Sequence, residues 1–279
     1  MLNDILYSTV RIDLVINEDE YENATGFVVS VGMLNKAIIT NAHVFQDNQG
    51  FPLNFSNCSF YIWITNSDGV KECKEFVLDG KKRSNIMFYS SSEDVEQIDL
   101  CAINIRDLIK PNIEFELIPF SFDSQVLLKG QRALESLDVT TQIIMIGYPS
   151  GIYDPASQLP VSRTGHISSN PSLDYMGESK FLIDIRTLHG SSGSPVFFTQ
   201  SNMYRNDQKE PGKYIRDLID LRFIGIFTEF LKDNIVLDDQ KRFEVSKDLG
   251  YVLKPNLVMK LMNRMFEPEK KLKQLFPPQ

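Results

Sequence analysis

Short apolar segments separated by turn residues are the feature that most constrains the fold. Residues 9–16 alternate polar and apolar side chains at a period of two, which is typical of a strand with one buried face. Strands of this length, bounded by Gly, Asn, Asp or Ser, predict an antiparallel barrel. The predicted strands cover residues 9–16, 26–31, 36–40, 59–64, 73–78, 86–89, 100–105, 142–149, 161–168, 181–185, 223–228 and 250–253.

Composition narrows the classes of function. The 279 residues are 42% hydrophobic, enough for one large domain or for two barrels. A net charge of −8 argues against general nucleic-acid binding. The N-terminus has no basic region followed by an apolar run, and no window resembles a membrane span. Three cysteines without metal-ligand spacing predict reduced thiols. We therefore expect a cytoplasmic protein with no membrane or nucleic-acid partner and no metal.

Residues 188–197 contain a serine between glycines, entered from and left through apolar strands. Gly190 and Gly193 flank Ser191 and Ser192, so the chain can bend tightly and point backbone N–H groups at one spot beside a hydroxyl. Such a run alone is more often a solvated turn. It becomes informative only if the chain supplies a base and a carboxylate, since a serine hydroxyl is a weak nucleophile.

Both partners stand upstream of this turn. His43 lies in the sequence Thr40-Asn41-Ala42-His43, just beyond a predicted strand end. Asp99 directly precedes the buried-looking run Leu100-Cys101-Ala102, where a carboxylate is costly without a partner. Asp94 and Glu96, in the preceding acidic loop, compete for the same role, although such loops are usually solvated.

These motifs resemble those of trypsin-like (chymotrypsin-fold) serine proteases, closest to HtrA/Deg-type members without a PDZ domain. The order His, Asp, Ser is that of chymotrypsin-type enzymes. The resemblance implies an all-β fold of two antiparallel six-stranded barrels and a C-terminal helix. Residues 1–118 would form the barrel with His43 and Asp99, residues 119–254 the barrel with Ser192, and residues 255–279 the helix and tail, with apolar spacing at 256–266 supporting that helix.

The resemblance also implies a mechanism for hydrolysing a protein or peptide substrate. Ser192 would attack the carbonyl, His43 would accept the proton, and Asp99 would orient His43. The N–H groups of Gly190 and Ser192 would form the oxyanion hole, and no cofactor is expected. Trypsin-like zymogens carry an aspartate where this chain has Ser191. We therefore expect no activation by cleavage, and leave open whether the protein folds active or is switched by an activating partner.

A specificity pocket is predicted from position along the chain. Arg186, six residues before the nucleophile, would lie at its base, with Thr228, Phe227 and Gly250 around it. An arginine there would favour acidic substrate side chains. Arg186 pointing away is the competing interpretation.

Two other functions stay open. The first is a protease-fold scaffold or sensor whose triad is inactive or gated by a partner. The second is an esterase or lipase, although Ser194 stands where the Gly-x-Ser-x-Gly elbow needs its last glycine.

Overall fold

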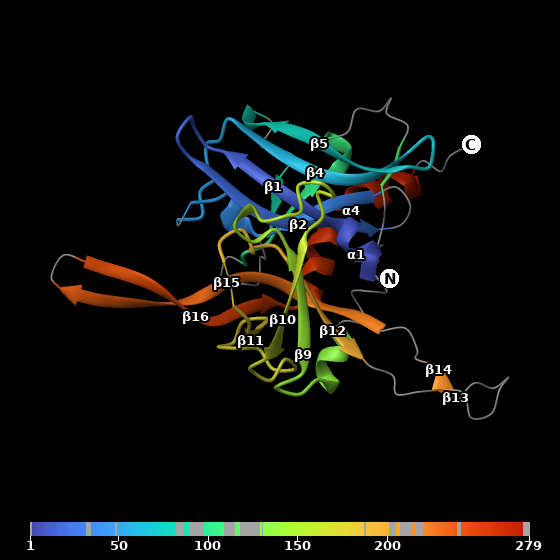
Figure 1. The fold of residues 1–279 in the computed structure, drawn as a ribbon. Coiled ribbons are helices and arrows are strands. Elements are labelled where there is room, and N and C mark those ends of the chain that lie inside the picture. The colour runs from blue at the N-terminus through green and yellow to red at the C-terminus, as the bar shows by residue number, and fades with distance from the viewer. Residues whose placement is uncertain are drawn as a thin grey trace.

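The computed structural model describes most of the chain and shows two β-rich halves (Figure 1). No helix among the described residues is both long and apolar enough to cross a membrane. The described residues are 2–31, 35–47, 49–81, 86–89, 98–108, 115–117, 129, 131–186, 188–200, 205–206, 214–215, 220–238 and 241–275.

The N-terminal half is an antiparallel sheet that begins after a short helix. Its strands follow the order β5-β4-β1-β2-β3-β7-β6, and β8 pairs with β4. Apolar side chains of β1 to β4 and β7 form its buried cluster, which includes Ile12, Ile38 and Phe60. The elements are α1 Leu2–Ser8, β1 Thr9–Val15, β2 Tyr21–Val31, β3 Asn35–Thr40, η1 Ala42–Val44, β4 Asn57–Asn66, β5 Lys71–Asp79, β6 Ile86–Phe88, β7 Cys101–Asn104, α2 Ile105–Leu108 and β8 Phe115–Leu117.

The C-terminal half is a closed barrel with the strand order β10-β11-β16-β15-β12-β9. Strands β15 and β16 continue beyond the barrel as a long hairpin, which projects from the left side of Figure 1. The elements are η3 Leu134–Ser136, β9 Gln142–Gly147, η4 Pro149–Gly151, β10 Val161–Ile167, β11 Lys180–Asp184, β12 Pro195–Gln200, β13 Arg205–Asn206, β14 Tyr214–Ile215, β15 Asp220–Asp238, β16 Lys241–Leu253 and α4 Pro255–Leu275.

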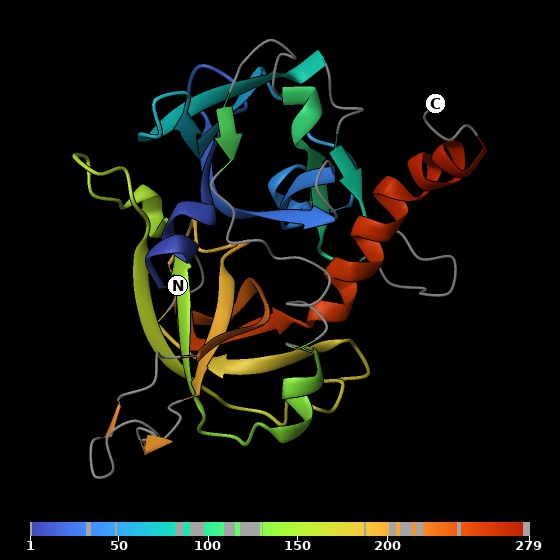
Figure 2. The same ribbon diagram turned by 90° about the vertical axis from the view of Figure 1, so that its right-hand side faces the viewer.

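Helix α4 joins the two halves. It runs along the side of both of them in Figure 2. Its residues Leu257, Leu261 and Phe266 are buried in one cluster with Phe27 from β2 and Phe223 from β15. Because this cluster draws on both halves, their relative position is fixed by apolar packing, and a cleft between them can keep a constant shape.

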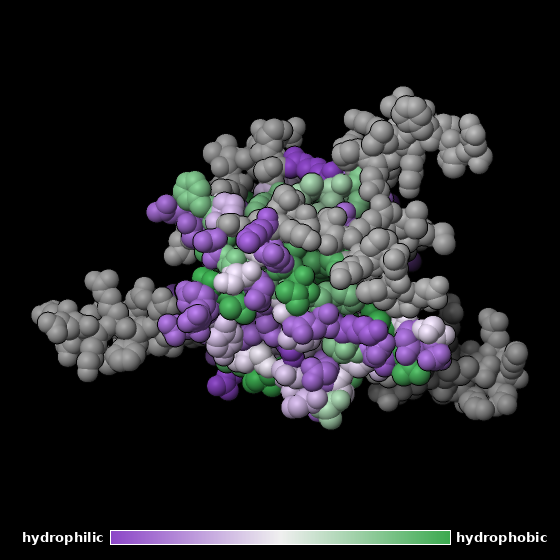
Figure 3. Space-filling view, turned by 90° about the horizontal axis from the view of Figure 1, so that it is seen from above, coloured by the Kyte–Doolittle hydropathy of each residue, from purple (hydrophilic) through white to green (hydrophobic). Residues whose placement is uncertain are grey.

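The predicted chymotrypsin-like fold class is confirmed, with one difference in the N-terminal half. Eight strands form this sheet, and its path does not close into a six-stranded barrel within the described residues. Strand β5 lies at one end of the sheet, and Val77 on it is 56% exposed. Figure 3 views the molecule from the side of this sheet and shows hydrophobic residues near the middle, surrounded by hydrophilic ones.

Candidate active site

His43 and Asp99 form a hydrogen-bonded pair at the edge of the N-terminal sheet. His43 lies in η1, just after β3, and Asp99 lies just before β7, which pairs with β3. The pairing of these strands therefore brings together two residues that are 56 positions apart. Asp99 Oδ2 lies 2.7 Å from His43 Nδ1, and Asp99 Oδ1 accepts the backbone N–H of His43 at 2.9 Å.

Two further residues hold Asp99 in place. The hydroxyl of Thr228 on β15 donates a short hydrogen bond to Asp99 Oδ2. The side-chain amide of Asn41 donates to the Asp99 carbonyl at 2.8 Å. Asp99 therefore receives hydrogen bonds from both halves of the molecule, and its carboxylate is fixed relative to the His43 ring.

Asp99 and His43 each stabilise the charged form of the other. Burial disfavours the ionised carboxylate, but the hydrogen bond and charge of His43, with the Thr228 hydroxyl, hold the pKa of Asp99 below its ordinary value. Burial also lowers the pKa of His43, but Asp99 together with the charges of Glu229 and Glu22 raises this pKa overall. The ionised form of Asp99 and the protonated form of His43 are thus both stabilised.

Ser192 lies on a tight turn whose glycines have positive φ angles, +77° at Gly190 and +83° at Gly193. A Cβ atom at Gly193 would overlap the carbonyl oxygen of Thr25 on β2. Glycine is required there both by the backbone angle and by the close approach of the other half. The sequence around the serine is therefore shaped by its contact with β2.

Three carbonyl groups of the turn accept hydrogen bonds. Leu188 O accepts the Ser191 N–H, Gly190 O accepts the Thr25 hydroxyl at 2.9 Å, and Ser192 O accepts the Thr25 N–H at 2.9 Å. By contrast, the N–H groups of Gly190 and Ser192 donate to no acceptor within the described part of the chain. Both residues line the cleft, so these two donors are available to a substrate oxygen, as an oxyanion hole requires.

One cleft between the two halves contains the three candidate catalytic residues. Its volume is about 1240 Å³, and His43, Asp99, Gly190 and Ser192 line it. Among the described residues, no hydrogen bond joins the Ser192 hydroxyl to the His43 ring. Hydrogen bonds of this kind are often long before substrate binds and shorten in the complex. The arrangement can support nucleophilic attack by a serine with base assistance.

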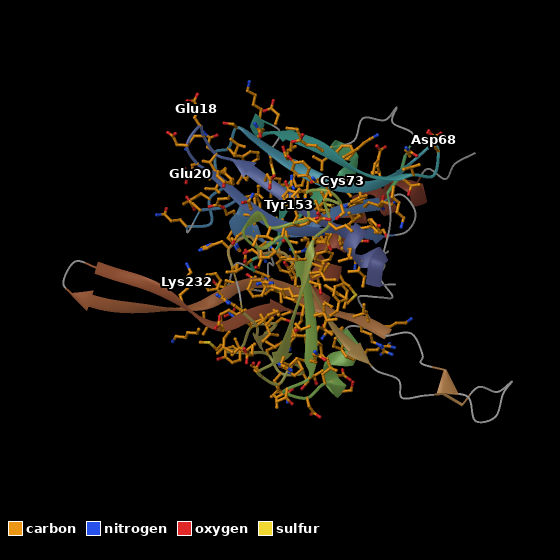
Figure 4. The ribbon with its side chains drawn as sticks, in the orientation of Figure 1. Glu18, Glu20, Asp68, Cys73, Tyr153 and Lys232 are labelled. Carbon is orange, nitrogen blue, oxygen red and sulfur yellow. The ribbon has the colours of Figure 1, made fainter. Side chains whose placement is uncertain are left out.

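The cleft lining is acidic. Among the residues that the structure describes, Glu20, Glu22, Asp47 and Glu229 line it together with a single lysine, Lys232. In Figure 4, Glu20 from the N-terminal half and Lys232 from the C-terminal barrel lie on the same side of the molecule. Glu20, Glu22 and Asp47 belong to the N-terminal half and Glu229 belongs to β15, so the negative charge comes from both walls of the cleft.

The four residues predicted to form a specificity pocket do not line this cleft. Arg186 is exposed, and its carbonyl accepts a hydrogen bond from Arg163 at 2.6 Å. Phe227 is 1% exposed, and its ring fills the space beside Gly250 that was expected to receive substrate. The Thr228 hydroxyl is bonded to Asp99. The lining of this cleft therefore gives no support to the predicted preference for acidic side chains.

Other side chains of the C-terminal half line the cleft instead. Leu188, His189, Phe230 and Tyr251 are among them, and the rings of His189 and Phe230 meet edge to face with their centroids 5.8 Å apart. His189 is exposed and thus lies at the rim of the cleft. Asp94 and Glu96, the alternatives to Asp99, lie outside the described residues.

Sequence reasoning missed the roles of three residues that shape the site. Thr25 lies in an Ala-Thr-Gly-Phe-Val segment whose resemblance to the family could have flagged it. Thr228 was singled out, but for the pocket rather than for Asp99. Arg163 donates to Ser191 Oγ at 2.7 Å, and no sequence pattern marked it because its partners come from a distant loop.

Comparisons with known proteins agree with this geometry. A search of curated proteins gave no match. Among solved structures, protease Anisep from Arthrobacter nicotinovorans matches with a TM-score of 0.51 and 12% identity, covering 92% of this chain and 94% of that one. The thermostable serine protease AL20 from an extremophilic microorganism matches with a TM-score of 0.50 and 13% identity, covering 94% and 98%. These likenesses concern the fold.

A scabies mite inactivated protease paralogue matches with a TM-score of 0.48 and 11% identity, covering 95% of this chain and 96% of that one. The model of the trypsin-like peptidase domain matches residues 24–203, which is more than half of the chain and includes His43, Asp99 and Ser192. The chain therefore belongs to the trypsin-like peptidase domain family.

Proposed function

We propose that this protein is a serine endopeptidase that cleaves protein substrates through a Ser192-His43-Asp99 triad. The observation that carries the proposal is the His43–Asp99 pair, joined at 2.7 Å, in one cleft with Ser192 and two free N–H groups. Family membership supports peptide bonds as the target.

The residues have separate roles in acyl transfer. His43 accepts the Ser192 hydroxyl proton as the oxygen attacks the carbonyl, and then gives the proton to the leaving amine. Asp99 keeps the Nδ1 of His43 protonated and stabilises the imidazolium. The N–H groups of Gly190 and Ser192 stabilise the oxyanion, and one such donor is typically worth about 3 kcal/mol of barrier. In deacylation His43 accepts a proton from water as the water oxygen attacks the acyl carbon, and then returns it to the Ser192 oxygen as the acyl–oxygen bond breaks and the carboxylic acid leaves.

The full-length protein and its Ser192→Ala variant provide the direct test. We expect a fluorophosphonate probe to label the wild type at Ser192 and to leave Ser192→Ala unlabelled. Wild-type protein should also release new N-termini from a denatured protein mixture, while Ser192→Ala and His43→Ala should not. Each variant should lose activity by a factor on the order of 10⁶, because triad members act as a unit.

A scaffold or sensor is the second candidate, favoured by the absence, within the described residues, of a hydrogen bond between Ser192 and His43. A wild-type protein that neither reacts with the probe nor cleaves any protein would support that function. Labelling only after a partner protein is added would instead indicate gating.

A further inference from the structure

Arg163 is hydrogen-bonded to the turn that carries the nucleophile. It is on β10, in the barrel wall, and its side chain is partly buried. Its Nη1 donates to the Arg186 carbonyl at 2.6 Å, and its Nη2 donates to Ser191 Oγ at 2.7 Å. The planar guanidinium therefore spans the two ends of the segment 186–191 with one rigid fork.

Ser191 connects Arg163 to the oxyanion-hole turn through hydrogen bonds. Its side chain is fully buried, and its hydroxyl donates to the Leu188 carbonyl at 2.6 Å while accepting from Arg163. The Ser191 N–H donates to the same carbonyl. These bonds close a turn in which Gly190 has φ +77°. The orientation of the peptide plane at Gly190, and hence of its N–H, depends on this turn.

The guanidinium is held without a carboxylate partner among the described residues. Its hydrogen-bond acceptors are a carbonyl and a hydroxyl, and burial lowers the pKa of Arg163. Placing a cation in a partly desolvated position without an opposite charge costs free energy. Two short charge-assisted hydrogen bonds offset part of that cost. Their acceptors, the Arg186 carbonyl and the Ser191 hydroxyl, are the two ends of the segment 186–191.

We propose that Arg163 is a positioning residue that holds the oxyanion-hole turn of this chain in its catalytic geometry. This inference rests on the proposed peptidase function. Arg163 touches no reacting atom, and it acts through Ser191 and the Leu188 carbonyl. Because the cation belongs to a barrel strand of the same chain, the turn is ordered without cleavage of the chain.

The test compares Arg163→Ala and Arg163→Lys with wild type in the full-length protein. Arg163→Ala should lower kcat by about 100-fold, the size expected for one oxyanion-hole donor, and leave KM nearly unchanged. Arg163→Lys should retain an intermediate kcat, since one ammonium cannot reach both acceptors in fork geometry. Guanidinium ion added at millimolar concentration should restore part of the kcat of Arg163→Ala.

Matched variants separate positioning from a loss of fold. Arg132→Ala removes an exposed arginine from the same half and should keep wild-type kinetics. The double variant Arg163→Ala/Ser191→Ala should lose no more activity than Arg163→Ala, because both changes break one chain of hydrogen bonds. A peptide aldehyde, which forms a tetrahedral adduct, should bind Arg163→Ala about 100-fold more weakly than wild type, while a product peptide binds equally.

Several outcomes would overturn the proposal. One is a folded Arg163→Ala protein with wild-type kcat. A second is a loss of kcat that only follows the loss of folded protein measured by circular dichroism, with no response to guanidinium. A third is a rise in KM confined to acidic peptides, which would make Arg163 a substrate receptor. A wild type without probe labelling would overturn the peptidase function as well, which distinguishes the two failures.

Discussion

His43 faces negative charge from more than one direction, and this sets the pH range in which it can accept a proton. Burial lowers its pKa, whereas the hydrogen bond and charge of Asp99 raise it, with smaller contributions from Glu229 and Glu22. Only the neutral ring can act as the base, so a raised pKa moves the acid limb of the activity profile to higher pH.

Glu229→Gln should move that limb back toward lower pH. Removing one negative charge near the ring destabilises the imidazolium, so the pKa of His43 falls and more of the enzyme is active at mildly acidic pH. The profile of kcat/KM against pH measures this shift. Glu135→Gln, an exposed residue outside the cleft lining, is the control. An unchanged acid limb in Glu229→Gln would show that Glu229 does not influence the base.

Single residues were predictable where a residue type that the reaction requires stands in a recognisable local motif. His43, Asp99 and Ser192 each stand in a local motif, and the structure brings the three to one cleft. Arg186 was placed by counting along the chain, and neither Arg186 nor Gly250 lines the cleft. The Phe227 ring takes the space beside Gly250. Local sequence does not encode which side chain fills such a space.

At the scale of elements, Thr25 links β2 to the nucleophile turn. Its hydroxyl donates to the Gly190 carbonyl and accepts the Tyr148 N–H, both at 2.9 Å, and the residue is fully buried. Its backbone N–H bonds to the Ser192 carbonyl. One residue of the N-terminal half thus helps to order the oxyanion hole of the C-terminal half.

Thr25→Val should weaken both stability and catalysis. The valine keeps the shape but leaves the Tyr148 N–H and the Gly190 carbonyl without this partner, at about 1–3 kcal/mol for each buried group. Urea unfolding should show this loss, and kcat should fall with it. Thr25→Ser retains the hydroxyl and should lose little of either. Equal stability of Thr25→Val and wild type would contradict this account of the turn.

Strands were predictable as elements where their alternation matches one buried face, as in β10. Strand β1 was also found, but its residues Thr9 to Ile12 are all buried, so it has no exposed face there. The extent of β15 and β16 was not predictable, because their hairpin continues beyond the barrel core that produces the apolar pattern. Helix α1 was also missed. The expected boundary between residues 118 and 119 lies outside the described residues.

At the scale of the whole molecule, the junction of the two halves determines the electrostatics of the cleft. The chain carries a net charge of −8, and within the described part of the chain four carboxylates besides Asp99 line the cleft with one lysine. A cleft lined mainly by one sign of charge concentrates ligands of the opposite sign. Dissolved salt screens this attraction, and the screening length is about 8 Å at physiological ionic strength.

We therefore expect kcat/KM to be higher for peptides with Lys or Arg near the scissile bond than for matched peptides with Asp or Glu. The difference should shrink as sodium chloride is raised, and it should narrow in Glu22→Gln/Glu229→Gln, because the Coulomb attraction of the cleft for cations is then reduced. Glu18→Gln removes an acidic residue that does not line the cleft and serves as the control. A preference for acidic peptides, or one insensitive to salt, would mean that shape rather than charge selects the substrate.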